Sequence, residues 1–145
     1  MKISKDMRKN YPKLSQWIET NLPKVICKKR VWNAFLKYSE LSTIRAIIAI
    51  TPGFFSPEIR YAIMPNANGE FRGSTQPDRI FLAKAICERF EKSDSNKKSM
   101  HLLVESTLLH EMVHWGDWKD GKDQAGEEGK AFEQAAYGKD VGRYW

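Results

Sequence analysis

The sequence predicts a single α+β domain, and three observations support this class. The chain has 145 residues, of which 41% are hydrophobic and 12% aromatic, and this is enough for one core. Apolar residues follow helical spacing near the start of the chain and again after residue 100, whereas residues 60–84 hold strand-like runs separated by turn signals. We expect a helical part over residues 1–58, and a part over residues 59–145 that contains a small sheet and further helices.

Two helices are expected in the first part. One begins at Tyr11-Pro12 and is stopped by Pro23, and the other runs from Val31 to Leu41 with apolar residues three and four positions apart. Thr51-Pro52-Gly53 follows them as a break, because proline and glycine interrupt regular structure.

A small antiparallel sheet is expected over residues 60–84. Residues 60–64 and 79–83 have the composition of strands, Asn68-Gly69 is a hairpin signal, and residues 70–72 are its returning arm. A short helical turn over residues 85–91 and a polar surface loop over residues 92–99 should follow.

Composition limits the classes of protein to which the chain can belong. The longest apolar run, Ala46–Ile50, is far shorter than the roughly 20 residues that span a bilayer. The N-terminus is cationic and lacks the apolar stretch of a secretory signal peptide, so export would need another machine. Cys27 and Cys87 are too few for a disulfide framework, and we expect free or buried thiols, with one disulfide as the alternative.

The net charge of +6 comes from the N-terminal third of the chain. Residues 1–45 hold 11 Lys and Arg against 3 Asp and Glu. The only basic cluster there, Lys28-Lys29-Arg30, is expected to be a solvated basic face, and a nucleic-acid arm is the alternative.

The segment from Met100 to Trp118 carries the strongest functional signal. No glycine or proline interrupts residues 101–115, so the segment should form a helix that ends near Gly116 or Gly121. Apolar side chains surround most of this helix, which predicts that it is buried between the sheet and other helices. The polar groups that it carries inward then need partners, because burying them unpaired costs on the order of several kcal/mol.

The residues His110-Glu111-Met112-Val113-His114 form the H-E-x-x-H pattern of zinc enzymes. The two imidazoles lie about 40° apart on the helix, one turn from each other, and can bind the same Zn²⁺. Glu111 lies about 100° from His110, where it can reach water at the ion without binding the ion itself, and this is the position of a general base. The alternative is a pair of hydrogen-bonded core histidines.

Catalytic zinc sites commonly use three protein ligands, so a third donor should follow the pattern. Residues 126–138 predict a second helix that Gly138 ends, and Glu133 lies in it among apolar residues, which favours a buried partner. We expect Glu133 to be the third ligand. Asp120, six residues after His114, is its rival, although the glycine of the longer H-E-x-x-H-x-x-G-x-x-H pattern is one place early.

The evidence that other polar residues near the pattern belong to the site is weaker. Asp117, about 20° from His110, either orients a ligand or is a solvated carboxylate. Tyr137 is the candidate donor to an oxyanion, and a core tyrosine with a satisfied hydroxyl is the alternative. His101 lies about 180° from His110 and so on the wrong face of the helix.

The sequence around the pattern resembles the zinc metallopeptidase toxin domains of bacterial polymorphic and type VI secreted toxins, in particular metallopeptidase toxin family 3. The resemblance spans residues 78–142, and the residues that carry it are Leu103–Asp117, Gly126-Glu127-Glu128-Gly129, Phe132-Glu133 and Tyr137-Gly138. It implies a zincin-like fold with zinc on His110 and His114, Glu111 as the base, and an acid of the downstream helix, here Glu133, completing the site. It also implies delivery into a rival or host cell and a cognate immunity protein.

These features predict a zinc-dependent metallopeptidase that acts as a secreted bacterial toxin on a protein or peptide substrate. We expect it to be made in the cytoplasm without a signal peptide and exported by a specialised secretion system, with a carrier as a further partner. In zincin-like folds the substrate backbone adds to the edge strand before the active-site helix, and residues 79–84 are placed for this role. The alternatives are a peptidoglycan amidase or peptidase of the same chemistry, a basic nucleic-acid-binding module with a structural metal, and a catalytically silent interaction domain.

Overall fold

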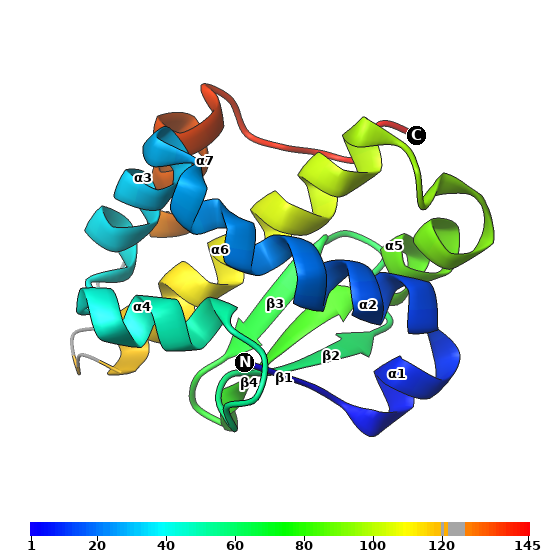
Figure 1. Ribbon diagram of the computed structural model, residues 1–145, viewed down its shortest axis with the longest axis horizontal. Helices are drawn as coiled ribbons and strands as arrows, with labels where there is room; N and C mark the ends of the chain where they lie inside the picture. Colours follow the sequence, from blue (N-terminus) through cyan, green and yellow to red (C-terminus); the bar gives the residue numbers. More distant parts are fainter. Residues whose placement is uncertain (120, 122–126) are drawn as a thin grey trace.

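The computed structural model describes residues 1–119, 121 and 127–145. Over these residues the fold is α+β, as the sequence predicts, with seven α-helices and one four-stranded sheet. The helices are α1 (Lys5–Asn10), α2 (Pro12–Asn21), α3 (Lys29–Ser39), α4 (Thr43–Ile50), α5 (Lys84–Arg89), α6 (Lys98–Lys119) and α7 (Glu128–Tyr137), and the strands are β1 (Lys2–Ile3), β2 (Glu58–Ala62), β3 (Gly69–Arg72) and β4 (Gln76–Ala83). Helix α6 contacts the sheet through β3 and β4 and also contacts the helix pair α3 and α7 (Figure 1).

The two helices expected before residue 58 are present as α2 and α3. Pro12 is favourable at the start of α2, because an N–H at this position would have no acceptor within the helix. Pro23 does not end helical structure, because the chain continues as a 3₁₀ helix over Leu22–Cys27 with this proline in its first turn. The short helix α4, which was not expected, is capped by Ser42, whose Oγ accepts from the backbone N–H of Arg45 at 3.3 Å.

The sheet has the order β1-β2-β4-β3 and is mixed, so the expectation of an antiparallel sheet is wrong for most of its pairs. β2 runs parallel to both β1 and β4, and only the β3–β4 pair is antiparallel. Asn68-Gly69 is not a hairpin turn. β3 returns along β4 through the turn over residues 73–75, and the loop over residues 63–68 carries the chain past β4 to the far edge.

This topology changes which strand lies at the edge beside α6. Residues 79–84 were expected at the edge, but β4 is flanked by β2 and β3 and its backbone is paired on both sides. β3 is the edge strand that contacts α6. Any strand that adds to the sheet next to this helix must therefore pair with β3.

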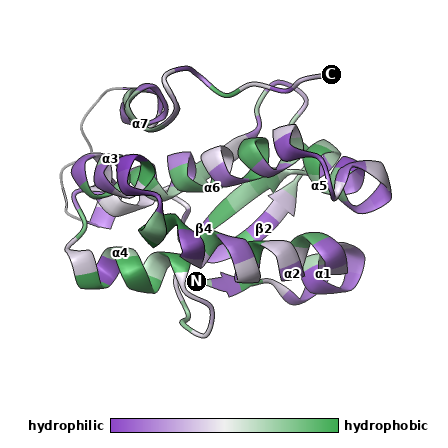
Figure 2. Cartoon of the chain, turned by 45° about the horizontal axis from the view of Figure 1, so that its top comes forward, coloured by the Kyte–Doolittle hydropathy of each residue, from purple (hydrophilic) through white to green (hydrophobic). Residues whose placement is uncertain are grey.

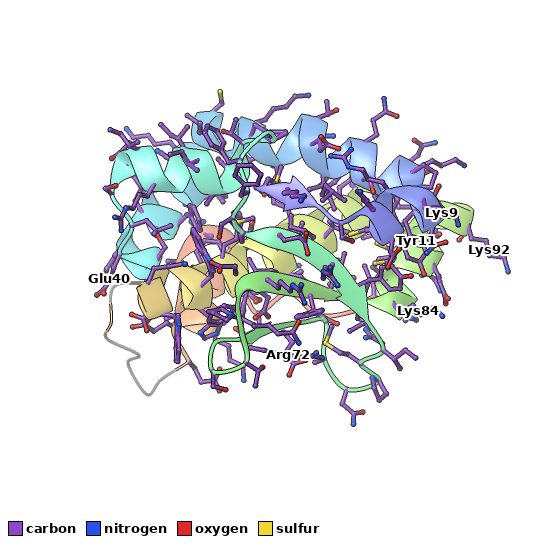
Figure 3. The ribbon with its side chains drawn as sticks, turned by 90° about the horizontal axis from the view of Figure 1, so that it is seen from below. Lys9, Tyr11, Glu40, Arg72, Lys84 and Lys92 are labelled. Atoms are coloured by element: carbon purple, nitrogen blue, oxygen red, sulfur yellow. The ribbon has the colours of Figure 1, made fainter. Side chains whose placement is uncertain are left out.

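The two faces of the sheet differ in character. Ile80 and Leu82 are fully buried in the core. Strand β4, which is coloured mainly as hydrophobic in Figure 2, packs against α6, whose colours are mixed. Phe81 lies on the opposite face, because successive strand residues alternate. There the guanidinium of Arg72, which is labelled in Figure 3, lies 4.2 Å from the centre of the Phe81 ring, and Phe81 is buried.

Residues 92–99 are not the simple surface loop that the sequence predicts. A π-helical turn covers Phe90–Asp94, and α6 already begins at Lys98. Asp94 is 1% exposed and accepts hydrogen bonds from Tyr144, Arg89 and Ser93. The hydroxyl of Tyr144 and these other donors hold the pKa of Asp94 well below its usual range, so polar composition here satisfies a buried carboxylate.

Both cysteines are free thiols, as expected, and the disulfide alternative is wrong. Cys27 is exposed, whereas burial of Cys87 raises the pKa of its thiol.

Candidate metal centre

His110 and His114 lie one turn apart on α6 and turn their rings toward the same point. Their Nε2 atoms are 3.3 Å apart and their ring centroids 5.1 Å apart. Two nitrogens bound to one zinc ion at about 2.0–2.1 Å with tetrahedral angles would be separated by about 3.3–3.4 Å. The separation in the structure therefore fits two ligands of a single ion.

Glu133 contacts His110 on the other side of the ring. Its Oε1 lies 2.5 Å from Nδ1 of His110, and its Oε2 accepts the backbone N–H of Val141 at 2.6 Å. A carboxylate on Nδ1 fixes the tautomer in which Nε2 is free to bind a metal. The structure thus brings Glu133 to the site as expected, but on the ring nitrogen that faces away from His114.

Only two donors converge within the described part of the chain. No group of three His, Cys, Asp or Glu side chains is close enough to share a metal ion there. Asp120, the rival third ligand, lies outside the described residues. Asp117 is 2% exposed, so the alternative of a solvated carboxylate is wrong, and it lines neither of the cavities beside the histidines.

Glu111 lies between α6 and the edge strand β3 and is 7% exposed. Burial raises the pKa of its carboxyl group to about 7, against the opposing effects of His110 and of a hydrogen bond from the backbone of Phe71. For His110, burial alone would lower the pKa, but the hydrogen bond to Glu133 and the charges of nearby carboxylates raise it above its ordinary value. A buried carboxyl that titrates near neutral pH suits the proton transfers expected of Glu111.

Two cavities flank His110 and Glu111. The larger, of about 460 Å³, is walled by β3, by the turn that follows it and by Trp118. Phe71 and Trp118 meet edge to face there, with ring centroids 6.4 Å apart. The smaller, of about 260 Å³, lies on the other side and reaches Lys130, Asp140 and Val141. A chain lying along β3 would therefore pass both histidines with space at either end.

Two glycines allow β3 and α7 to approach α6 so closely. A Cβ on Gly69 would lie 2.7 Å from Cγ2 of Thr107 and 2.9 Å from Cγ of Glu111. A Cβ on Gly129, in the first turn of α7, would lie 2.2 Å from Nε2 of His110. The backbone of α7 thus rests against the ring of His110, and any side chain at residue 129 would displace it.

Tyr137 and Glu105 meet away from the two histidines. The hydroxyl of Tyr137 donates to Oε1 of Glu105 at 3.1 Å, and burial raises the pKa of this tyrosine. Tyr137 lines neither cavity beside His110. These contacts favour the core role that was the alternative to oxyanion binding. His101, as expected, lies elsewhere: its Nε2 is 2.7 Å from the carbonyl oxygen of Ser95 and its ring stacks on Trp17.

The basic cluster Lys28-Lys29-Arg30 is partly used within the fold. Lys28 is paired with Oε2 of Glu105, and Nε of Arg30 donates to the carbonyl oxygen of Ala135 at 2.8 Å. Lys28 thus joins the start of α3 to α6, and Arg30 joins α3 to α7. These contacts explain two of the three charges without a nucleic acid.

The sequence analysis did not assign Gly69, Gly129 or Val141 to the site. A glycine inside a helix costs about 1 kcal/mol relative to alanine, so its presence in the first turn of α7 is a signal of close approach. Val141 carries no such signal, because its contribution is a backbone N–H that any residue except proline supplies.

We expect Glu105→Ala to destabilise the protein. The substitution leaves the buried hydroxyl of Tyr137 without its acceptor and Lys28 without its partner, which should cost about 1–3 kcal/mol in the free energy of unfolding. Urea denaturation measures this quantity. Glu88→Ala is the matched control, because Glu88 pairs with Lys84 on the surface of α5 and its loss should cost less than about 0.5 kcal/mol. Equal stability of the two variants would contradict the role assigned to Glu105.

Gly129→Ala should weaken metal binding without unfolding the protein. The added methyl group overlaps the ring of His110, whereas alanine is otherwise favoured over glycine in a helix by about 1 kcal/mol. We expect the Zn²⁺ dissociation constant, measured by competition with a chromophoric chelator, to rise by about tenfold or more. Glu88→Ala is the control, because Glu88 pairs with Lys84 on the surface of α5 and lines neither cavity beside His110. Wild-type affinity in Gly129→Ala would show that the ring does not need this space.

Comparison with known proteins identifies a family. The profile of the family described as Metallopeptidase toxin 3 matches residues 7–138, and the match reaches further toward the N-terminus than the resemblance found in the sequence. Neither the curated proteins nor the solved structures include a match to the chain. The matched region covers most of the chain, which therefore belongs to the metallopeptidase toxin 3 family.

Proposed function

We propose that this member of the metallopeptidase toxin 3 family is a zinc-dependent peptidase, with His110 and His114 as metal ligands and Glu111 as general base. The observation that supports this most is the 3.3 Å separation of the two Nε2 atoms beside a buried carboxyl group, at the wall of an open cavity. A hydrogen bond between the two rings gives the same separation, so the buried carboxyl group and the open cavity beside the rings are what favour a metal over a pair of core histidines. The imidazole and carboxylate donors suit zinc among the metals that enzymes use for hydrolysis.

We assign Glu133 to the orientation of His110. The contact with Nδ1 supports this role, and its second oxygen is already held by Val141. A catalytic zinc ion takes three protein ligands. Under this assignment the third must come from a residue other than those that converge in the described chain, and Asp120 is the candidate that the sequence provides.

The chemistry follows from these positions. When bound, zinc polarises the scissile carbonyl and lowers the pKa of water to about 7. Glu111 accepts the proton of the attacking water and then delivers it to the amine nitrogen of the leaving half, so that one carboxyl group serves both steps. Burial raises the pKa of Glu111 to about 7 without the ion, and a cation bound beside it would lower this value, which favours the carboxylate that accepts the proton. We keep Tyr137 as a core residue rather than as the oxyanion donor.

The fold supports a zincin-like arrangement in which the substrate pairs with β3. This edge strand lies against α6 at Gly69, so its outer edge borders the histidines, although the backbone N–H of Phe71 is already donated to Glu111. Strand addition holds a peptide through main-chain hydrogen bonds, whereas pockets select side chains. The aromatic wall of Phe71 and Trp118 offers an apolar surface to one side chain of such a peptide.

The family description supports action as a toxin on a protein or peptide. We extend this to export by a specialised secretion system, delivery into a target cell, and a cognate immunity protein in the producing cell. Among the described residues, no helix combines the length and the apolar character needed to cross a membrane.

Replacement of the proposed base tests the function. Glu111→Gln keeps the size of the side chain but cannot accept the proton, so turnover should fall by about 10²-fold or more while Zn²⁺ still binds. The assay is metal analysis of the purified protein, followed by mass spectrometry of proteins and of muropeptides incubated with wild type and with Glu111→Gln. Glu88→Gln, on the surface of α5, is the matched control.

Four results of this experiment separate the alternatives. Cleaved proteins support the peptidase, whereas cleaved muropeptides alone support an enzyme that acts on peptidoglycan. Absence of bound metal in wild type, or full activity of Glu111→Gln, would exclude the proposed mechanism.

A further inference from the structure

The segment after α7 crosses the molecule and is held at several points. After Gly138 the chain runs from α7 toward the π-helical turn (Figure 1). The guanidinium of Arg143 donates to the carbonyl oxygens of Met64 at 3.1 Å and of Ala67 at 2.8 Å, and to the side-chain oxygen of Asn68 at 3.0 Å. One side chain thus fixes this segment to the loop that leads into the edge strand.

The same segment reaches the metal centre through its backbone. Val141 is partly buried against the core, and its N–H donates to Oε2 of Glu133 at 2.6 Å. The other oxygen of this carboxylate contacts Nδ1 of His110 at 2.5 Å. A continuous chain of hydrogen bonds therefore runs from the backbone at residue 141 to the imidazole whose Nε2 faces His114.

This arrangement determines how firmly Glu133 is held. A glutamate has three rotatable side-chain bonds, so a single contact with His110 would leave its carboxylate free to turn. With each oxygen on a separate partner, the carboxylate is fixed in position and orientation. Glu133 is 7% exposed, so water cannot readily replace either partner.

We propose that residues 141–143 act as a positioning strap for the metal centre. Val141 N–H holds Glu133, Glu133 holds His110 in the tautomer with a free Nε2, and Arg143 anchors the strap to the loop over residues 63–68. The expected effect on metal affinity rests on the proposed function, whereas the geometry assigned to His110 does not. It makes Val141 and Arg143 positioning residues rather than catalytic ones.

The test compares substitutions that differ in one hydrogen bond. Val141→Pro removes the backbone N–H, whereas Val141→Ala keeps it and shortens the side chain. Arg143→Ala releases the anchor without touching Glu133, and Lys139→Ala is its control in the same exposed segment. The probe is Zn²⁺ alone, titrated in competition with a chromophoric chelator.

Val141→Pro and Arg143→Ala should each weaken Zn²⁺ binding by about tenfold, the range found when a group that orients a metal ligand is removed. The two controls should remain within about twofold of wild type. Wild-type affinity in a folded Val141→Pro protein would overturn the proposal, and so would a loss as large in the controls.

Two measurements on metal-free protein make the result independent of catalysis and of variant folding. The chain has three histidines, so nitrogen NMR can assign the tautomer of each ring. We expect His110 to carry its proton on Nδ1 in wild type and to lose this preference in Val141→Pro.

In wild type the amide of Val141 should exchange slowly with solvent, although it lies outside every helix and strand. Rapid exchange, or a His110 proton on Nε2, would overturn the strap even if the variants do not fold. A wild type that meets both expectations but binds no Zn²⁺ would instead refute the proposed function.

Discussion

Helix α6 carries polar side chains into the interior of the protein, where each needs a partner because an unpaired buried group is costly. The partners come from the start of α3, from α7 and from β3. Glu105 is satisfied by Lys28 at the start of α3 and by Tyr137 at the end of α7, and His110 is satisfied by Glu133. Glu111 faces β3 and receives its backbone contact there. The packing around α6 is therefore arranged by polar contacts as well as by its apolar surface.

Within this packing, the absence of side chains matters as much as their presence. β3 and α7 approach α6 at Gly69 and Gly129, and a methyl group at either position would meet atoms at 2.7 Å or less. At these two glycines the backbone of β3 lies next to Glu111 and the backbone of α7 lies next to His110, with no side chain between them. The cavities on both sides remain open because the strand and the helix meet α6 at glycine.

Local sequence patterns predicted the helices and the H-E-x-x-H residues better than the sheet and the hydrogen bonds that hold Glu133 and His110. The H-E-x-x-H pattern is local, so His110, Glu111 and His114 could be placed on one helix from their spacing alone. Asn68-Gly69 was misleading, because the same two residues serve a tight turn or a strand that presses against a helix, and only tertiary contacts decide between them. Strand direction was also misleading, since β2 alternates apolar and polar residues, which is typical of antiparallel strands, whereas both of its pairs are parallel. The position of Glu133 was predicted, but whether its carboxylate meets the ion or Nδ1 depends on how α7 docks.

The order of strands in the sheet has a consequence for how the protein folds. β3 and β4 are joined by a short turn, and α6 follows them after α5 and the π-helical turn. One wall of the larger cavity is therefore built from contacts that are close in sequence and lose little loop-closure entropy. The pairing of β1 with β2 and the docking of α7 on α3 join segments that are far apart along the chain. We expect the β3–β4 hairpin and α6 to form an early folding nucleus, with α7 arriving afterwards. A nascent or partly unfolded chain would then carry both imidazoles on a formed helix but lack the carboxylate that orients His110, so that ion capture becomes a late event in folding.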